Sequence, residues 1–159
     1  MRKDVIKSTA IESIFNKKSS KMLTTSTQLR VRYGETDPMG YLYYGNYAQF
    51  FEVGRVEMIR SLGLSYKEME DEYGILMPVM SLHIRYIRPA LYDDLLTIET
   101  TLRQLPNDTI TFFVEIFNEK RKLICGGEVK LCFIDQTSKK RLLAPKYLID
   151  RLLIHFCNP

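Results

Sequence analysis

Candidate catalytic residues are concentrated in one stretch, ETDPMGYLYYGNY, over residues 35–47. Within it, Asp37 precedes a proline, and the proline ring restricts Asp37 to extended backbone, so the sequence partly sets its orientation. Gly40 and Gly45 follow, and glycines let a backbone fold back on itself. Asn46 then stands before an apolar, helix-like run as its predicted N-cap.

This arrangement predicts a carboxylate that faces backbone donors across a small gap. The first amide N–H groups of a helix have no intrahelical partners, and together with the helix dipole they favour negative charge. Such a site suits attack on a carbonyl: the acid adds directly or deprotonates a water, and the amides hold the oxyanion. The residues alone leave an alternative open, that Asp37 caps a turn, as Asp-Pro sequences commonly do. The tyrosines fit either a pocket or a dimer interface.

Other catalytic and metal-binding patterns are absent from the sequence. It has no GxSxG, no P-loop and no GxGxxG, and His83 and His155 are not spaced as metal ligands. Cys125, Cys132 and Cys157 form an odd set without CxxC spacing, so we expect reduced, buried thiols rather than a disulfide or a metal site. A carboxylate is therefore the best candidate for a catalytic group.

The basic residues are concentrated at the start of the chain. The chain has 23 Lys and Arg residues and 19 Asp and Glu residues. Residues 1–22 hold 6 of the basic and 2 of the acidic residues, so the remainder has 17 of each. We expect residues 1–22 to be a poorly ordered tail and residues 23–159 to be one domain. A neutral domain gives no support for nucleic-acid binding. The sequence shows no signal peptide and no membrane-spanning run, so we expect a cytoplasmic protein.

Hydrophobic periodicity predicts the elements that position the loop. The predicted strands cover residues 28–33, 79–87, 95–103, 109–117 and 123–134, and the predicted helices cover residues 47–62, 65–74 and 144–156. Short connections between the later strands indicate an antiparallel meander. Gly54 allows close approach to the long helix, and Gly126-Gly127 suggests a bulge. The predicted fold is α+β, with an antiparallel sheet of about five strands around one long central helix.

Two segments resemble a known family. RVRYGETDPMGYLYYGNY, residues 30–47, resembles the signature of the 4-hydroxybenzoyl-CoA thioesterase family, which includes the Tol-Pal-associated type. RPALYDDLLTIET, residues 88–100, is similar to the strand junction of that family. The resemblance extends from Gln28 to Pro145. It implies a hotdog fold and an acyl-CoA thioesterase.

The resemblance also implies roles for individual residues. Asp37 takes the place of the catalytic nucleophile or general base, and the backbone at Tyr44 and Gly45 polarises the thioester carbonyl. The implied substrate-binding residues are Tyr41, Asn46, Tyr47, Arg85 and Arg88. Of these, Arg85 and Arg88 are the candidates for binding the coenzyme A phosphates, and Arg55 is a weaker candidate for the same role. Tyr41 and Leu42 depart from the family pattern beside the acyl pocket, so they leave the acyl specificity open. Coenzyme A enters as part of the substrate, with no metal or redox cofactor.

We therefore expect a thioesterase that acts on a small or medium acyl-CoA, with aromatic acyl groups among the candidates. The resemblance further implies a homodimer with the site at its interface, and a homotetramer built from it. One alternative is an acyl-carrier-protein thioesterase, although a neutral domain attracts an acidic carrier little. The other is a non-catalytic acyl-CoA-binding protein, which would not need a placed acid.

Overall fold

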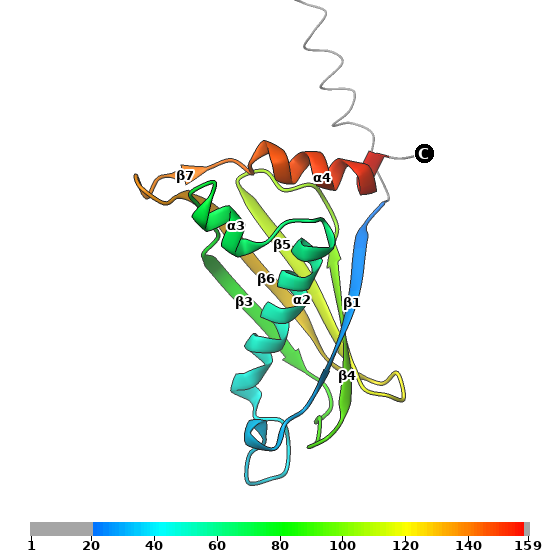
Figure 1. Cartoon of the computed structure of the whole chain (residues 1–159). Helices are drawn as coiled ribbons and strands as arrows, with labels where there is room; N and C mark the ends of the chain where they lie inside the picture. Colours follow the sequence, from blue (N-terminus) through cyan, green and yellow to red (C-terminus); the bar gives the residue numbers. More distant parts are fainter. Residues whose placement is uncertain (1–20, 158–159) are drawn as a thin grey trace, which may run out of the picture.

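An antiparallel sheet curves around one long helix, as predicted, but the sheet has seven strands rather than five (Figure 1). The computed structural model describes residues 21–157, so nearly all of the predicted tail lies outside the described residues. The helix is α2 (Tyr47–Ser61), and the long strands are β1 (Leu23–Arg30), β3 (Val79–Tyr86), β4 (Leu95–Leu102), β5 (Thr109–Phe117) and β6 (Leu123–Asp135). The two further strands, β2 (Ile75–Leu76) and β7 (Arg141–Leu142), are too short to show a period in the sequence.

The first strand lies earlier than predicted. β1 pairs with β4 along its whole length, from Leu23 opposite Leu102 to Arg30 opposite Leu95, whereas the prediction placed the strand at 28–33. The segment TTST after Leu23 carries no apolar side chain, so alternation in hydrophobicity could not reveal it.

The predicted meander holds only for β4, β5 and β6. The order across the sheet is β1-β4-β5-β6, and β3 pairs with β6 on the far side rather than with β4. Residues 87–94 therefore carry the chain past two strands. A short connection limits how far the chain can travel, but it does not decide which edge of the sheet is free.

The central helix packs closely on the sheet at Gly54, as predicted. A Cβ atom there would lie 2.8 Å from Cγ2 of Ile98 and closer still to Oγ1 of Thr100, both on β4. The glycine pair at 126–127 is different, because β3 pairs with residues 125–131 without a bulge at that point. Gly127 instead leaves room for the carbonyl of His83, which a Cβ would overlap.

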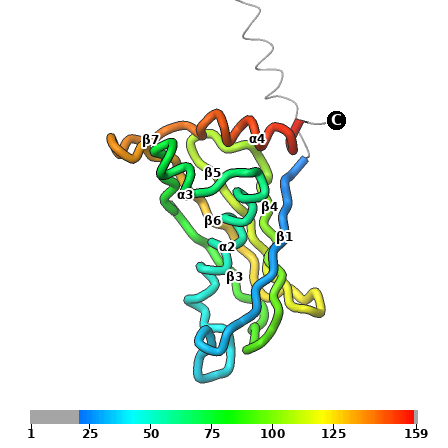
Figure 2. The backbone as a smooth tube through the Cα atoms, viewed as in Figure 1, coloured from blue at the N-terminus to red at the C-terminus, as the bar shows by residue number. Residues whose placement is uncertain are grey.

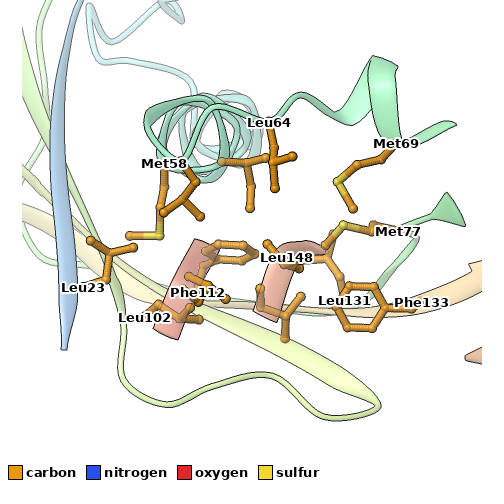
Figure 3. Packing of buried hydrophobic residues seen from close by; sticks show 14 of the residues in the cluster. Leu23, Met58, Leu64, Met69, Met77, Leu102, Phe112, Leu131, Phe133 and Leu148 are labelled. Atoms are coloured by element: carbon orange, nitrogen blue, oxygen red, sulfur yellow. The ribbon is translucent and has the colours of Figure 1, made fainter. Parts of the chain in front are cut away.

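The buried side chains form two clusters along α2. One lies beneath α3 (Tyr66–Asp71) and α4 (Lys146–Cys157), and Figure 3 shows Met58, Phe112 and Leu148 meeting there. The other includes Phe50 and Phe51 and lies beside the loop of residues 31–46. That loop stands at the end of the molecule remote from α4 (Figures 1 and 2).

The cysteines are all free thiols, but only two of the three are buried. Cys125 and Cys132 lie in β6, whereas Cys157 is exposed at the last residue of α4, which corrects the expectation for that thiol. Within residues 21–157, no helix is both long enough and apolar enough to span a bilayer.

Candidate active site

Asp37 is held by the turn that it forms. Its Oδ1 atom accepts hydrogen bonds from the N–H groups of Met39 at 2.9 Å and Tyr41 at 3.2 Å. Gly40 donates its N–H to the Asp37 carbonyl and has a φ of 77°, a conformation that favours glycine. Oδ2 has no hydrogen-bond partner in the described part of the chain. The turn-capping alternative therefore holds for one carboxylate oxygen, and the other remains available for chemistry.

The helix start presents two unpaired donors. A 3₁₀ turn, η2 (Tyr44–Asn46), leads directly into α2, and the N–H of Asn46 bonds the Tyr43 carbonyl. The N–H groups of Tyr44 and Gly45 have no hydrogen-bond partner among residues 21–157. A Cβ at Gly45 would lie 2.6 Å from Cε1 of Tyr43, so the glycine makes room for that ring.

Asn46 ties the acid loop to the helix and does not cap it. Its backbone is already helical, at φ −81° and ψ −16°, because η2 continues the helix backwards. The predicted capping bond is therefore absent, and the Asn46 amide donates instead to the Glu35 carbonyl at 2.9 Å. That carbonyl also accepts the N–H of Tyr43 at 2.9 Å. The segments that carry the acid and the free amides are thus fastened together.

Sequence reasoning missed Glu35 and Ala90, which fix this loop. The buried Glu35 carboxylate accepts the backbone N–H of Arg32 at 2.8 Å and its Nη2 at 2.6 Å. The hydrogen bond between the two side chains raises the pKa of Arg32. Leu42 donates its N–H to the Ala90 carbonyl at 2.7 Å, so the crossing segment 87–94 supports the loop. The Ala90 contact spans distant parts of the chain and has no local sequence signal.

A cleft of about 270 Å³ joins the acid to the helix start. Five of the predicted site residues line it: Asp37, Tyr41, Tyr44, Tyr47 and Arg88. The structure adds Met39, Leu42, Tyr86, Ile87 and Pro89 to its walls. Burial raises the pKa of Tyr47 to about 12, so this phenol stays neutral at physiological pH. Apart from Asp37 and Arg88, the walls are apolar or aromatic.

The other predicted site residues lie elsewhere. Neighbouring residues of a strand point to opposite faces, so Arg85 lies on the far side of β3 from Tyr86, in a different hollow with His83 and Arg103. Asn46 and Gly45 are not among the residues that line the cleft. Arg55 lies over the ring of Tyr66, 5.1 Å from its centroid. The structure therefore brings the acid, the tyrosines and Arg88 together and separates Arg85 from them.

Residues 31–152 match the family model described as the thioesterase-like superfamily. The chain belongs to this superfamily. It is 31% identical over 121 residues to the acyl-CoA thioesterase YbgC of Haemophilus influenzae, covering 76% of this chain and 88% of that protein. It is 30% identical over 106 residues to the 4-hydroxybenzoyl-CoA thioesterase of a Pseudomonas strain, covering 65% of this chain and 72% of that protein.

Solved structures agree with this assignment. The DHNA-CoA thioesterase from Staphylococcus aureus superimposes with a TM-score of 0.72 at 34% identity, covering 84% of this chain and 83% of that one. Membership of the thioesterase-like superfamily confirms the predicted family and its hotdog fold, and with them the prediction of a thioester hydrolase. Among the described residues of this superfamily member, no three His, Cys, Asp or Glu side chains lie close enough to hold a metal ion.

Proposed function

We propose that this chain hydrolyses the thioester of a small or medium acyl-CoA, with aromatic acyl groups favoured, to the free acid and coenzyme A. The proposal depends on one observation above all: Asp37 and Tyr44 line the same cleft. Asp37 carries the carboxylate oxygen Oδ2 and Tyr44 carries a backbone N–H, and neither of these two atoms has a hydrogen-bond partner within residues 21–157. The relatives named as acyl-CoA thioesterases support coenzyme A as the carrier.

In the proposed reaction, Oδ2 of Asp37 attacks the thioester carbonyl carbon or removes a proton from an attacking water. Either route places negative charge on the carbonyl oxygen, which the amides of Tyr44 and Gly45 stabilise. The C–S bond then breaks and the coenzyme A thiolate leaves. If Asp37 attacks directly, water hydrolyses the resulting anhydride. Every reacting group belongs to the chain, the substrate or water, so the proposal includes no metal or redox cofactor.

The cleft favours a compact, flat acyl group. Its volume of about 270 Å³ lies just below the range of about 300–1,000 Å³ for small-molecule sites. Tyr41, Tyr44, Tyr47 and Tyr86 supply aromatic walls, against which a planar ring packs well. We propose Arg88, at the rim of these walls, as the contact for a coenzyme A phosphate. Arg85 has no such place in the cleft of its own chain.

The decisive experiment replaces the acid without disturbing its turn. In Asp37→Asn, the amide oxygen can still accept the bonds from Met39 and Tyr41. The charge is lost, so we expect kcat to fall about 10³-fold while the protein stays folded. Thiol release is measured on acetyl-, hexanoyl-, benzoyl- and 4-hydroxybenzoyl-CoA. The control is Asp108→Asn, an exposed carboxylate between β4 and β5 that lies near Arg141 and should retain full activity.

Three outcomes would change the assignment. An Asp37→Asn variant that keeps more than about a tenth of kcat would remove Asp37 from the mechanism, since positioned acid–base groups contribute ~10²–10⁴-fold. If the same acyl groups were hydrolysed only when attached to acyl-carrier protein, the carrier would be that protein and not coenzyme A. Acyl-CoA binding without thiol release would favour the non-catalytic alternative. A single turnover in ¹⁸O-water tests the direct route: label in Asp37 shows that water opened an anhydride at the Asp37 carboxyl carbon, whereas base catalysis places the label only in the product acid.

A further inference from the structure

Tyr86, the last residue of β3, contacts the helix start from across the cleft. Its hydroxyl donates a hydrogen bond to the carbonyl oxygen of Tyr44 at 3.0 Å. Its ring also lies edge-on to the rings of Tyr44 and Tyr47, with centroids 6.3 and 5.2 Å apart. Burial raises the pKa of Tyr86, so its hydroxyl remains protonated and able to donate at neutral pH.

The carbonyl that Tyr86 contacts belongs to a peptide group with a free donor at its other end. The Tyr44–Gly45 peptide is planar and trans, so the Gly45 N–H points away from the Tyr44 carbonyl. The N–H of Tyr47 donates to the same oxygen, so two donors occupy its two lone pairs. The Gly45 N–H itself has no partner in the part of the chain that the structure describes. Tyr86 thus holds one end of a peptide whose other end carries an unpaired donor.

Gly45 makes this contact important. Glycine accepts positive and negative φ about equally, so a peptide group next to it can turn over at low cost. Turned over, the peptide would present a carbonyl oxygen where an N–H donor had been. An oxygen at that place would repel a developing oxyanion instead of stabilising it. The space needed by the Tyr43 ring keeps a larger residue from replacing Gly45 and stiffening the chain.

We propose that Tyr86 is a positioning residue for thioester hydrolysis, whose hydroxyl fixes the Tyr44–Gly45 peptide so that the Gly45 N–H, one of the two free amides of the helix start, remains a donor. This inference rests on the proposed function, because it assumes that these amides stabilise the oxyanion. In this role Tyr86 touches no reacting atom. The hydroxyl acts on the transition state and not on substrate affinity, so removing it alone should lower kcat and leave KM nearly unchanged.

The test compares two substitutions at the same position. Tyr86→Phe keeps the ring and removes the hydroxyl, whereas Tyr86→Leu removes both. We expect Tyr86→Phe to lower kcat about tenfold with KM changed less than about twofold, below the ~10²–10³ ceiling for loss of an oxyanion donor. Tyr86→Leu should lower kcat at least as much and also raise KM, because it removes an aromatic wall of the cleft. Tyr92→Phe is the matched control, since Tyr92 is exposed, packs edge-on to Tyr33 and lies outside the cleft, and it should match the wild type.

A second measurement does not depend on activity. In ¹H–¹⁵N spectra without substrate, Tyr86→Phe should shift the Gly45 amide resonance, because its peptide has lost a hydrogen bond, and Tyr92→Phe should not. If Asp37→Asn stayed active, the proposed function would fail while this shift still reported on Tyr86. The inference is overturned by an unmoved Gly45 resonance, by a Tyr86→Phe kcat within twofold of wild type, or by a raised KM at unchanged kcat. A loss confined to Tyr86→Leu would also overturn it, because the ring and not the hydroxyl would matter.

Discussion

Single side chains in this protein hold the backbone of the cleft in place. Asp37 closes its own turn through Oδ1, Asn46 fastens the helix start to Glu35, and Tyr86 bonds the Tyr44 carbonyl. Beneath them lies Cys125, a fully buried thiol. Burial raises the pKa of Cys125 to about 12, and this makes the residue a source of pH-dependent stability.

The sign of that dependence follows from proton binding. Unfolded Cys125 ionises near its ordinary pKa of 9.0, whereas the folded thiol keeps its proton until about pH 12. The folded state binds more protons between these values, so the free energy of unfolding falls as pH rises above about 9. At ~1.4 kcal/mol per pKa unit, the loss by pH 12 is on the order of 4 kcal/mol. The raised pKa of Tyr47 acts in the same direction.

Urea unfolding at pH 8 and pH 10.5 measures this loss. In Cys125→Ala the free energy of unfolding should decline less between the two pH values, although the variant starts from a lower stability. Cys157→Ser, which changes the exposed thiol of α4, should decline as the wild type does. An equal decline in Cys125→Ala and wild type would show that Cys125 does not titrate in this way.

At the scale of elements, the packing of α2 on β4 sets how close the helix lies to the sheet. Gly54 faces two β-branched side chains, Ile98 and Thr100, which have few rotamers and cannot swing aside. Alanine at position 54 would gain ~1 kcal/mol of helix propensity, but overpacking typically costs ~1–3 kcal/mol. We expect Gly54→Ala to lower the free energy of unfolding by about 1–2 kcal/mol.

Denaturant unfolding tests this expectation, and a second substitution at Thr100 should restore part of the lost stability. Thr100 Oγ1 is buried without a hydrogen-bond partner in the described residues, so Thr100→Ala sacrifices no such bond. The double variant Gly54→Ala/Thr100→Ala should therefore recover part of the stability. Gln49→Ala, on the exposed side of α2, is the control and should change stability by less than about 0.5 kcal/mol. A Gly54→Ala protein more stable than wild type would contradict the close packing.

At the scale of the whole molecule, the sheet ends in an apolar edge beside the cleft. β3 pairs with β6 on one side only, and Val79, Met80 and Leu82 are each 40–50% exposed. Leu82 and Val79 also line a hollow between this edge and α2. Unpaired apolar edges are uncommon in monomers because they add strands from other chains. We propose that two copies join here as a homodimer, with a homotetramer assembled from such dimers.

Light scattering with size-exclusion chromatography checks the assembly. Leu82→Arg should convert the oligomer to monomers, because it places a desolvated charge in the joined edge. It should also lower activity, since the same strand ends at Tyr86 in the cleft wall. Ile154→Arg changes another exposed apolar residue, on α4, and should leave both properties as they are. A wild-type protein that is monomeric and fully active at micromolar concentration would rule the dimer out.

Features that depend on near neighbours could be predicted from the order of the amino acids. The helix over residues 47–61, the strands β4, β5 and β6 and the placing of Asp37 ahead of a helix start all follow from local periodicity and turn residues. The signature around Asp37 was also enough to predict the family.

The folded structure was needed to show which distant segments meet. It placed β3 at the edge beside β6, put Arg85 on the face away from the cleft, and joined Tyr86 to Tyr44 across 42 residues. It also showed that the Asn46 side chain bonds the Glu35 carbonyl and does not cap the helix. Strand pairing and long-range hydrogen bonds depend on which edges and carbonyl groups remain unpaired once the whole sheet has formed. A local sequence pattern does not contain this information.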